Sequence, residues 1–195
     1  MLKIETLLSK ESLQKLTMLI KKFIIFDRDG TLIKYVPYLS NPSSVELIPG
    51  AKEFVNNLLK NSNKLFLHTN QSGVSRGVFN LQDVIKCNER LIELLGFGND
   101  LFERICIATE LNLSKNSYRK PSPRFANEII NDYKIDRSDL IYIGDNISDL
   151  ETADNAGCNA FGIINKKLSS SVENNNLGYR IFKNIKELNN FFYEN

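Results

Sequence analysis

Hydrophobic and polar residues divide the chain into strand-like runs and helix-like repeats. Short, mostly apolar runs are typical of strands buried in a parallel sheet, and they occur at residues 23–26, 65–68, 104–108, 140–143 and 160–163. Apolar residues at helical spacing predict helices at 51–59, 81–97, 125–133, 149–156 and 184–193. Because parallel strands need right-handed crossovers, this order predicts an α/β fold, a three-layer α/β/α sandwich with a Rossmann-like parallel sheet.

The two ends of the chain differ from this pattern. Residues 9–22 repeat apolar side chains at helical spacing, with Ser9 where an N-cap would stand, and predict an amphipathic helix. The Ser- and Asn-rich segment 169–176 is expected to be a loop. We therefore expect an N-terminal helical extension over 1–22 and a single domain over 23–195.

Composition narrows the class of protein. A chain of 195 residues suits one domain, and its 42% hydrophobic content supplies a core. With 25 Lys and Arg against 23 Asp and Glu, the net charge of +2 gives no electrostatic reason to expect nucleic acid or a membrane as partner. The longest uncharged stretch near the N-terminus, 16–20, is shorter than the apolar region of a signal peptide, which favours a cytoplasmic protein. We expect a monomer or a small homo-oligomer.

Three cysteines are too few and too far apart for a disulfide framework. They are expected to be buried apolar side chains in a reducing compartment, and they are Cys87, Cys106 and Cys158.

Polar motifs follow the predicted strands where an α/β site is expected, at their carboxyl ends. Asp27–Thr31 ends the first strand and Thr69–Gly73 ends the second. Arg119–Lys120 precedes Pro121, and Gly144–Asp149 ends the fourth strand. Each motif alone has a conformational explanation, since Asp and Gly favour turns, but their joint order indicates a site.

The residue types in these motifs point to phosphoryl chemistry. Asp27 and Asp29 would repel each other, and together with Asp145 they form an oxygen-only set that suits Mg²⁺. A carboxylate beside such a cation can attack phosphorus, so Asp27 is the expected nucleophile and Asp29 the expected acid and base. Lys120 and Thr69 are expected to neutralise the phosphoryl oxygens.

The motifs resemble those of the haloacid dehalogenase superfamily of aspartate-nucleophile phosphatases. More narrowly, they are similar to the branch that contains histidinol phosphatases and D-glycero-D-manno-heptose 1,7-bisphosphate phosphatases. The resemblance implies that Asp27, the Asp29 carbonyl and Asp145 hold Mg²⁺, and that Asp149 orients Lys120. It also implies a set of substrate-binding residues, which comprises Asn70, Gln71, Ser72, Arg119 and Tyr38 within the segment 35–38.

Two departures from that branch affect cofactor and substrate. Its members often carry a zinc loop before the Arg-Lys-Pro segment, but between Cys106 and Lys120 this chain has no further Cys and no His, so we predict no zinc. Asn146 replaces the Lys that tends to follow the motif-four Asp in heptose phosphatases. We therefore expect a small phosphorylated substrate, a sugar phosphate such as the heptose bisphosphate, without fixing the sugar.

The loops after the first and third strands are too short for a folded cap, so the site is expected to be open. Histidinol phosphatase and polynucleotide 3′-phosphatase remain alternatives, and so does a phosphate-binding scaffold without activity. His68, the single histidine, alternates away from Thr69 and is interpreted as a packed residue.

Overall fold

The computed structural model describes residues 22–114, 116–164, 168 and 179–193. Its centre is a six-stranded sheet in the order β3-β2-β1-β4-β5-β6, in which every pairing is parallel. The strands are β1 (Phe23–Phe26), β2 (Lys64–Asn70), β3 (Arg104–Ala108), β4 (Leu140–Gly144), β5 (Asn159–Ile163) and β6 (Arg180–Phe182). The predicted α/β class with a parallel sheet is confirmed.

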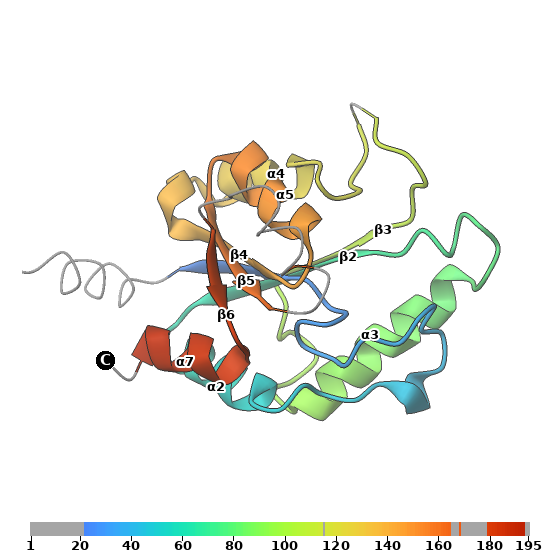
Figure 1. Cartoon of the computed structure of the whole chain (residues 1–195), viewed down its shortest axis with the longest axis horizontal. Coiled ribbons are helices and arrows are strands. Elements are labelled where there is room, and N and C mark those ends of the chain that lie inside the picture. The colour runs from blue at the N-terminus through green and yellow to red at the C-terminus, as the bar shows by residue number, and fades with distance from the viewer. Residues whose placement is uncertain (1–21, 115, 165–167, 169–178, 194–195) are drawn as a thin grey trace, which may run out of the picture.

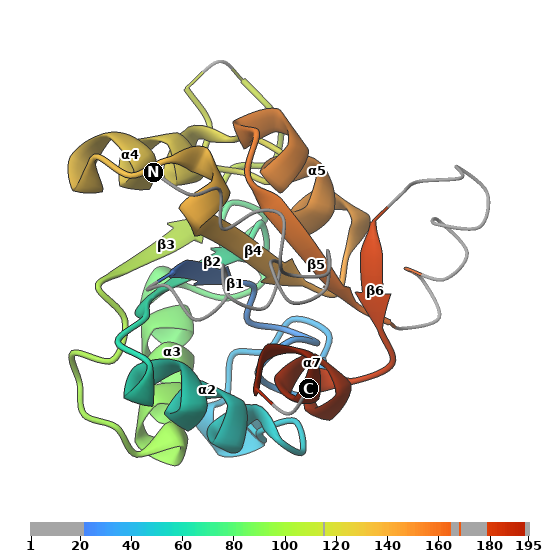
Figure 2. The same ribbon diagram turned by 90° about the vertical axis from the view of Figure 1, so that its left-hand side faces the viewer.

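Helices cover both faces of the sheet (Figures 1 and 2). On one face lie α2 (Ala51–Lys60), α3 (Leu81–Leu95) and α7 (Ile185–Tyr193), and on the other lie α4 (Arg124–Tyr133) and α5 (Ile147–Ala156). Two short 3₁₀ turns complete the described elements, at Pro42–Ser44 and Arg137–Asp139.

Side-chain alternation along β1 builds the two cores. Ile24 and Phe26 point into the core shared with α2, α3 and α7, whereas Phe23 and Ile25 point into the core under α4 and α5. All four side chains are buried, so the apolar run of this strand is used on both faces. A strand covered in this way cannot shift by one residue without exchanging its two cores.

The structure adds one strand that the pattern did not predict. β6 has only three residues and lies at the edge of the sheet, where Ile181 pairs with Gly162 of β5. Such a short segment carries too little alternation to be recognised alone. Residues 9–21 of the expected N-terminal helix and the expected loop 169–176 lie outside the described residues.

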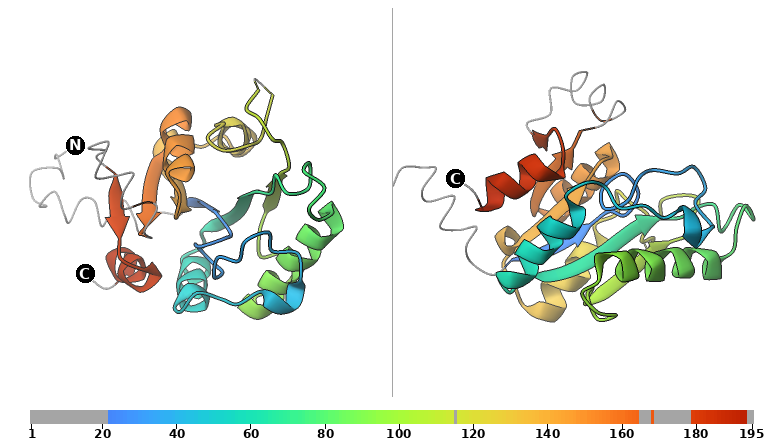
Figure 3. Two further views of the ribbon diagram at one scale, coloured as in Figure 1. Left: turned by 45° about the vertical axis from the view of Figure 1, so that its right-hand side comes forward. Right: turned by 90° about the horizontal axis from the view of Figure 1, so that it is seen from below.

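The connections that could carry a cap are simple. The described segment 27–50 contains the 3₁₀ turn Pro42–Ser44 and two isolated β-bridges, and the described residues of 109–123 contain no helix or strand. Figure 3 shows both segments beside the body of the sandwich. In the part of the chain that is described, no folded cap stands over the sheet.

The three cysteines are unbonded, with Cys87 and Cys106 buried and Cys158 half-buried. Burial raises the pKa of Cys106 to about 12.

Among the described residues, we find no helix with the length and apolar content that crossing a bilayer requires.

Candidate active site

The strand order reverses beside β1, and the candidate site lies there. From β1 the chain adds β2 and β3 on one side, and then crosses to add β4, β5 and β6 on the other. In open parallel sheets, ligands bind beyond the carboxyl ends of the strands at such a switch point. The register pairs Phe26 with Ile143, and the Asp27 N–H donates to the Ile143 carbonyl at 2.8 Å. The first and fourth motifs therefore leave the sheet side by side.

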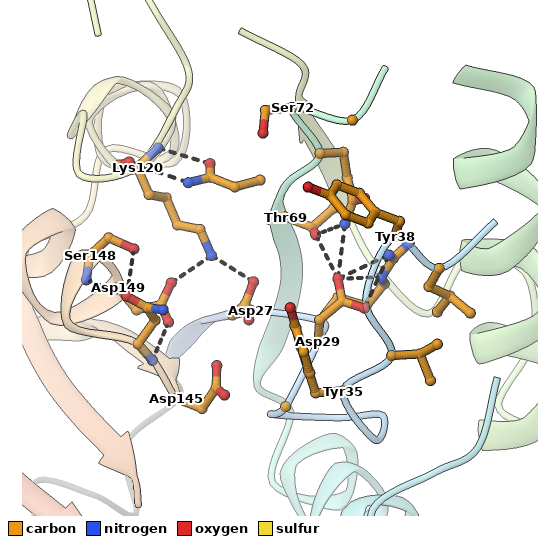
Figure 4. Close-up of a pocket in the computed structure, with 18 of the residues that line it drawn as sticks. Asp27, Asp29, Tyr35, Tyr38, Thr69, Ser72, Lys120, Asp145, Ser148 and Asp149 are labelled. Atoms are coloured by element: carbon orange, nitrogen blue, oxygen red, sulfur yellow. Dashed lines mark hydrogen bonds and ion pairs between the residues drawn. The ribbon is translucent and has the colours of Figure 1, made fainter. Parts of the chain in front are cut away.

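Three carboxylates gather at this edge (Figure 4). One oxygen from each of Asp27, Asp145 and Asp149 lies within 4.8 Å of the others. Asp27 and Asp149 are buried, and Asp145 is half-buried. Such an oxygen-only donor set fits a hard divalent cation.

Lys120 is the buried cation that faces two of these acids. Its Nζ lies 2.6 Å from Asp27 Oδ1 and 2.5 Å from Asp149 Oδ1, and it also donates to the His68 carbonyl at 3.1 Å. The lysine is only 4% exposed. The Lys120 ammonium is therefore fixed in direct contact with Asp27, the expected nucleophile.

Burial and charge act in opposite directions on these groups. Burial raises the pKa of the Asp27 carboxyl well above its usual range, and Asp149 and Asp145 add to this, although Lys120 lowers it. Burial alone would lower the pKa of the Lys120 ammonium, but Asp149 and Asp27 outweigh it and raise that pKa. Three carboxylates lie close together in this cluster, and a cation bound among them would reduce their mutual repulsion.

Asp149 does two things at the start of α5. Its Oδ2 accepts from the Asn146 N–H at 2.9 Å, while the Asn146 side chain caps the helix in return. Its Oδ1 faces Lys120. Both carboxylate oxygens are thus engaged, which ties the position of Lys120 to a helix N-terminus.

Gly144 leaves room for this arrangement. A Cβ at Gly144 would stand 2.2 Å from Asp149 Oδ2 and 2.4 Å from Asp149 Cβ. We expect Gly144→Ala to push Asp149 away from Lys120, lowering stability by about 1–3 kcal/mol and lowering catalytic rate as well. Thermal melting and rate measurements on one preparation would check this.

Gly162→Ala is the matched control, because Gly162 is the β5 residue paired with Gly144. A Cβ there meets apolar side chains, beginning with Ile181 Cδ1 at 2.4 Å. We expect this variant to lose stability and to keep its rate. Equal rate losses in the two variants would show that strain in the sheet, rather than Asp149, is responsible.

Asp29 stands apart from the acidic cluster. Its carboxylate pairs with Arg28, with Nη2 at 2.9 Å from Oδ2, and accepts from Gln71 Nε2 at 2.9 Å and from Thr69 Oγ1 at 3.3 Å. The resemblance implied that Asp29 meets the metal through its carbonyl, which stays a prediction, and the Asp29 side chain contacts Arg28, Gln71 and Thr69. Its donors hold it in one orientation beside the cleft.

Two sets of side-chain contacts that support the site had no recognisable signal in the sequence. Arg28, which is fully buried, also donates to Asn88 Oδ1 of α3 at 2.8 Å, so that α3 helps to hold Asp29. Asn70, which was predicted to bind substrate, lines the cleft, and its amide also bonds the main chain of Lys120 in both directions, at 3.0 Å and 3.2 Å. Both contacts join residues 50 or more positions apart.

The remaining predicted residues lie around an open cleft of about 940 Å³. Ser72 and Arg119 line it, and the Arg119 Nη1 donates to the Glu110 carbonyl at 3.3 Å. Tyr35 and Tyr38 also line it, with 69% and 57% of their surface exposed. The cleft thus has a charged floor and a rim with two aromatic rings (Figure 4).

The fold and the site together define an α/β protein with an acidic, lysine-bearing cleft at the switch point of a parallel sheet, and this cleft fits a divalent cation. The model of the haloacid dehalogenase-like hydrolase family matches residues 34–163. The chain belongs to this family, as its motifs indicated.

Named relatives support the same family. The D-glycero-D-manno-heptose-1,7-bisphosphate 7-phosphatase of Chlorobaculum tepidum is 34% identical over 150 residues, covering 70% of this chain and 75% of the relative. The D-glycero-alpha-D-manno-heptose-1,7-bisphosphate 7-phosphatase of Campylobacter jejuni is 27% identical over 173 residues. This match covers 89% of this chain and 96% of the relative.

A solved structure shares the fold. It is the D,D-heptose 1,7-bisphosphate phosphatase of B. bronchiseptica, complexed with magnesium and phosphate. Its TM-score is 0.79 at 23% identity, with 89% of this chain and 98% of that chain covered.

Proposed function

We propose that the chain is a Mg²⁺-dependent phosphomonoester hydrolase that acts through an aspartyl phosphate on Asp27. The observation that carries this proposal is the buried contact between Lys120 and Asp27 within the acidic cluster. The proposed substrate is a sugar phosphate of the D-glycero-D-manno-heptose 1,7-bisphosphate kind, which the names of the relatives support.

The metal assignment uses the chemistry of the donors. Asp27 and Asp145 would hold Mg²⁺ together with the Asp29 carbonyl. The two carboxylate oxygens of Asp149 already contact the Asn146 N–H and Lys120 Nζ. Bound Mg²⁺ would relieve the repulsion among the acids and withdraw charge from the phosphoryl oxygens. No zinc is proposed, since the segment from Cys106 to Lys120 offers no tetrahedral set of Cys and His.

Each of the chain's proposed catalytic residues has a separate role in the reaction. Asp27 attacks phosphorus as the bond to the leaving oxygen breaks, and Asp29 donates a proton to that oxygen. Asp29 then takes a proton from a water that attacks the acyl phosphate, which releases inorganic phosphate and frees Asp27. Lys120 and Thr69 hold the phosphoryl oxygens throughout.

A phosphate-release screen tests the proposal. The panel contains heptose and other sugar phosphates, histidinol phosphate, nucleotides and 3′-phosphorylated DNA, each with added Mg²⁺ and after EDTA treatment. Release from the heptose bisphosphate that EDTA abolishes supports the proposal. Preference for histidinol phosphate or DNA would favour those alternatives, and phosphate binding without release from any ester would indicate a scaffold.

Arg119 is proposed to bind the part of the substrate that does not react. We expect Arg119→Ala to raise KM for the best phosphosugar about 10- to 100-fold, the range for hydrogen bonds to a charged group. It should leave p-nitrophenyl phosphate unaffected, because the aryl ester presents nothing for Arg119 to hold. Arg90→Ala, on α3 outside the cleft, is the control. Equal losses on both esters would place Arg119 at the reacting phosphate instead.

A further inference from the structure

Tyr118, the residue before Arg119 and Lys120, is held at three points. Its N–H donates to Glu110 Oε1 at 2.7 Å, and its hydroxyl donates to Glu128 Oε1 of α4 at 2.8 Å. Its carbonyl lies 2.8 Å from the Nε2 of His68 on β2. The first contact stays within the loop, but the other two fix the loop to the body of the sandwich.

His68 is the partner that reaches Tyr118 from the sheet. It is fully buried on the face covered by α4, where its ring meets Phe125 edge-on at 5.1 Å. Its other nitrogen, Nδ1, lies 2.8 Å from the Tyr142 hydroxyl on β4. Because a carbonyl only accepts, Nε2 carries the proton and Nδ1 accepts from Tyr142.

This histidine is neutral at any ordinary pH. Burial and the nearby charge of Lys120 lower the pKa of His68 to about 3, against a smaller upward effect of the bond to Tyr118. A buried imidazole costs free energy unless both nitrogens are paired. Packing alone does not require a polar ring here, since other residues in this core, such as Phe66 and Ile25, are apolar.

β2 also holds the loop on the other side of Arg119. The His68 carbonyl accepts from Lys120 Nζ at 3.1 Å, and Asn70 bonds the Lys120 main chain. Arg119 therefore lies between Tyr118, whose carbonyl is held by the His68 ring, and Lys120, whose main chain is held by Asn70.

We propose that His68 is a positioning residue, which sets the placement of Arg119 and Lys120 by holding the Tyr118 carbonyl to β2. The proposal rests on the proposed function only in so far as Lys120 binds the phosphoryl group. His68 itself touches no reacting atom.

Two substitutions separate the two ring nitrogens. The amide nitrogen of glutamine in His68→Gln reaches about as far from the backbone as Nε2, so it can keep the bond to Tyr118. The shorter amide of His68→Asn matches Nδ1, so it can keep the bond to Tyr142 and must lose Tyr118. Tyr142→Phe removes only the bond to Nδ1.

Amide hydrogen exchange measures how firmly the loop is held, and it needs no substrate. We expect His68→Asn to speed amide exchange in peptides covering Tyr118 to Lys120, while His68→Gln and Tyr142→Phe leave it close to that of the unchanged chain. Ile129→Val, in the same core under α4, controls for a general loss of stability and should not speed exchange selectively there.

Activity then tests whether the placement matters. We expect His68→Asn to lower kcat about 10- to 100-fold, as a misplaced catalytic group does, and His68→Gln to restore most of it. Because Lys120 meets every substrate, the loss should appear on p-nitrophenyl phosphate as well as on the phosphosugar.

Unchanged exchange in His68→Asn would overturn the proposal, and so would equal kcat values for the asparagine and glutamine variants. If no ester in the screen is hydrolysed, the proposed function fails, and the exchange measurement alone decides whether His68 holds the loop.

Discussion

Asp27→Asn is expected to abolish phosphate release while leaving the fold intact. The amide keeps the shape of the side chain but cannot attack phosphorus, and loss of a covalent nucleophile costs about three orders of magnitude or more in rate. The fold should tolerate the change because burial and the neighbouring acids already raise the pKa of Asp27 well above its usual range. A neutral amide at position 27 removes a negative charge that burial and the neighbouring carboxylates disfavour.

Three measurements on one preparation check this expectation: phosphate release, circular dichroism and mass spectrometry after an acid quench. The unchanged chain should gain the mass of one phosphoryl group during turnover, and the variant should not. Asp139→Asn is the control, because Asp139 is an ion-paired carboxylate whose partner is Lys22, away from the cleft. A rate above about one tenth of the original in Asp27→Asn would contradict the covalent mechanism.

Lys120→Met is expected to have the second largest effect, on both rate and stability. Removing a positioned donor to a developing negative charge costs about 10²- to 10³-fold in kcat. Breaking a buried ion pair from one side costs about 3–5 kcal/mol, and here two acids, Asp27 and Asp149, lose their partner together. The loss should affect every substrate, because the reacting phosphate is common to all of them.

The stability loss has a predictable pH dependence when it is measured with EDTA present. Without Lys120 the pKa of Asp27 rises further above its unfolded value, so the folded state binds the proton more tightly than the unfolded state. Stability should then increase as the pH falls through that raised pKa and decrease as it rises. Unfolding curves at several pH values would check this sign.

Lys22→Met provides a matched control, because Lys22 is also buried, at 6% exposed, and pairs with Asp139 at 2.8 Å. We expect it to lose stability and to retain kcat. A Lys120→Met variant that keeps its kcat would remove Lys120 from the phosphate site.

Much of the fold could be read from local pattern. β1 and β3 occupy the residues that their apolar runs predicted, and α2 and α4 differ from the predicted spans by one residue each. The reason is that burial on one or both faces imposes a period on the sequence itself. β6 was missed because three edge residues carry no period, and its place depends on pairing with β5.

The candidate site divides in the same way. The order of motifs along the chain predicted that Asp27, Thr69, Lys120 and Asp145 would meet, since carboxyl ends of parallel strands share one edge of the sheet. Those four residues do line one cleft. Their chemical roles remain predictions for the experiments above.

The sequence by itself determined the class of the protein and the residue types at its cleft, because hydrophobic period and motif spacing are local properties. Only the tertiary structure decided the partners: Arg28 with Asn88, Asn70 with the Lys120 main chain, and His68 with Tyr118. Each of these bonds spans at least 50 positions. A hydrogen bond needs its atoms within about 3 Å, and strand register together with the path of a loop sets that distance, which no local pattern of residues encodes.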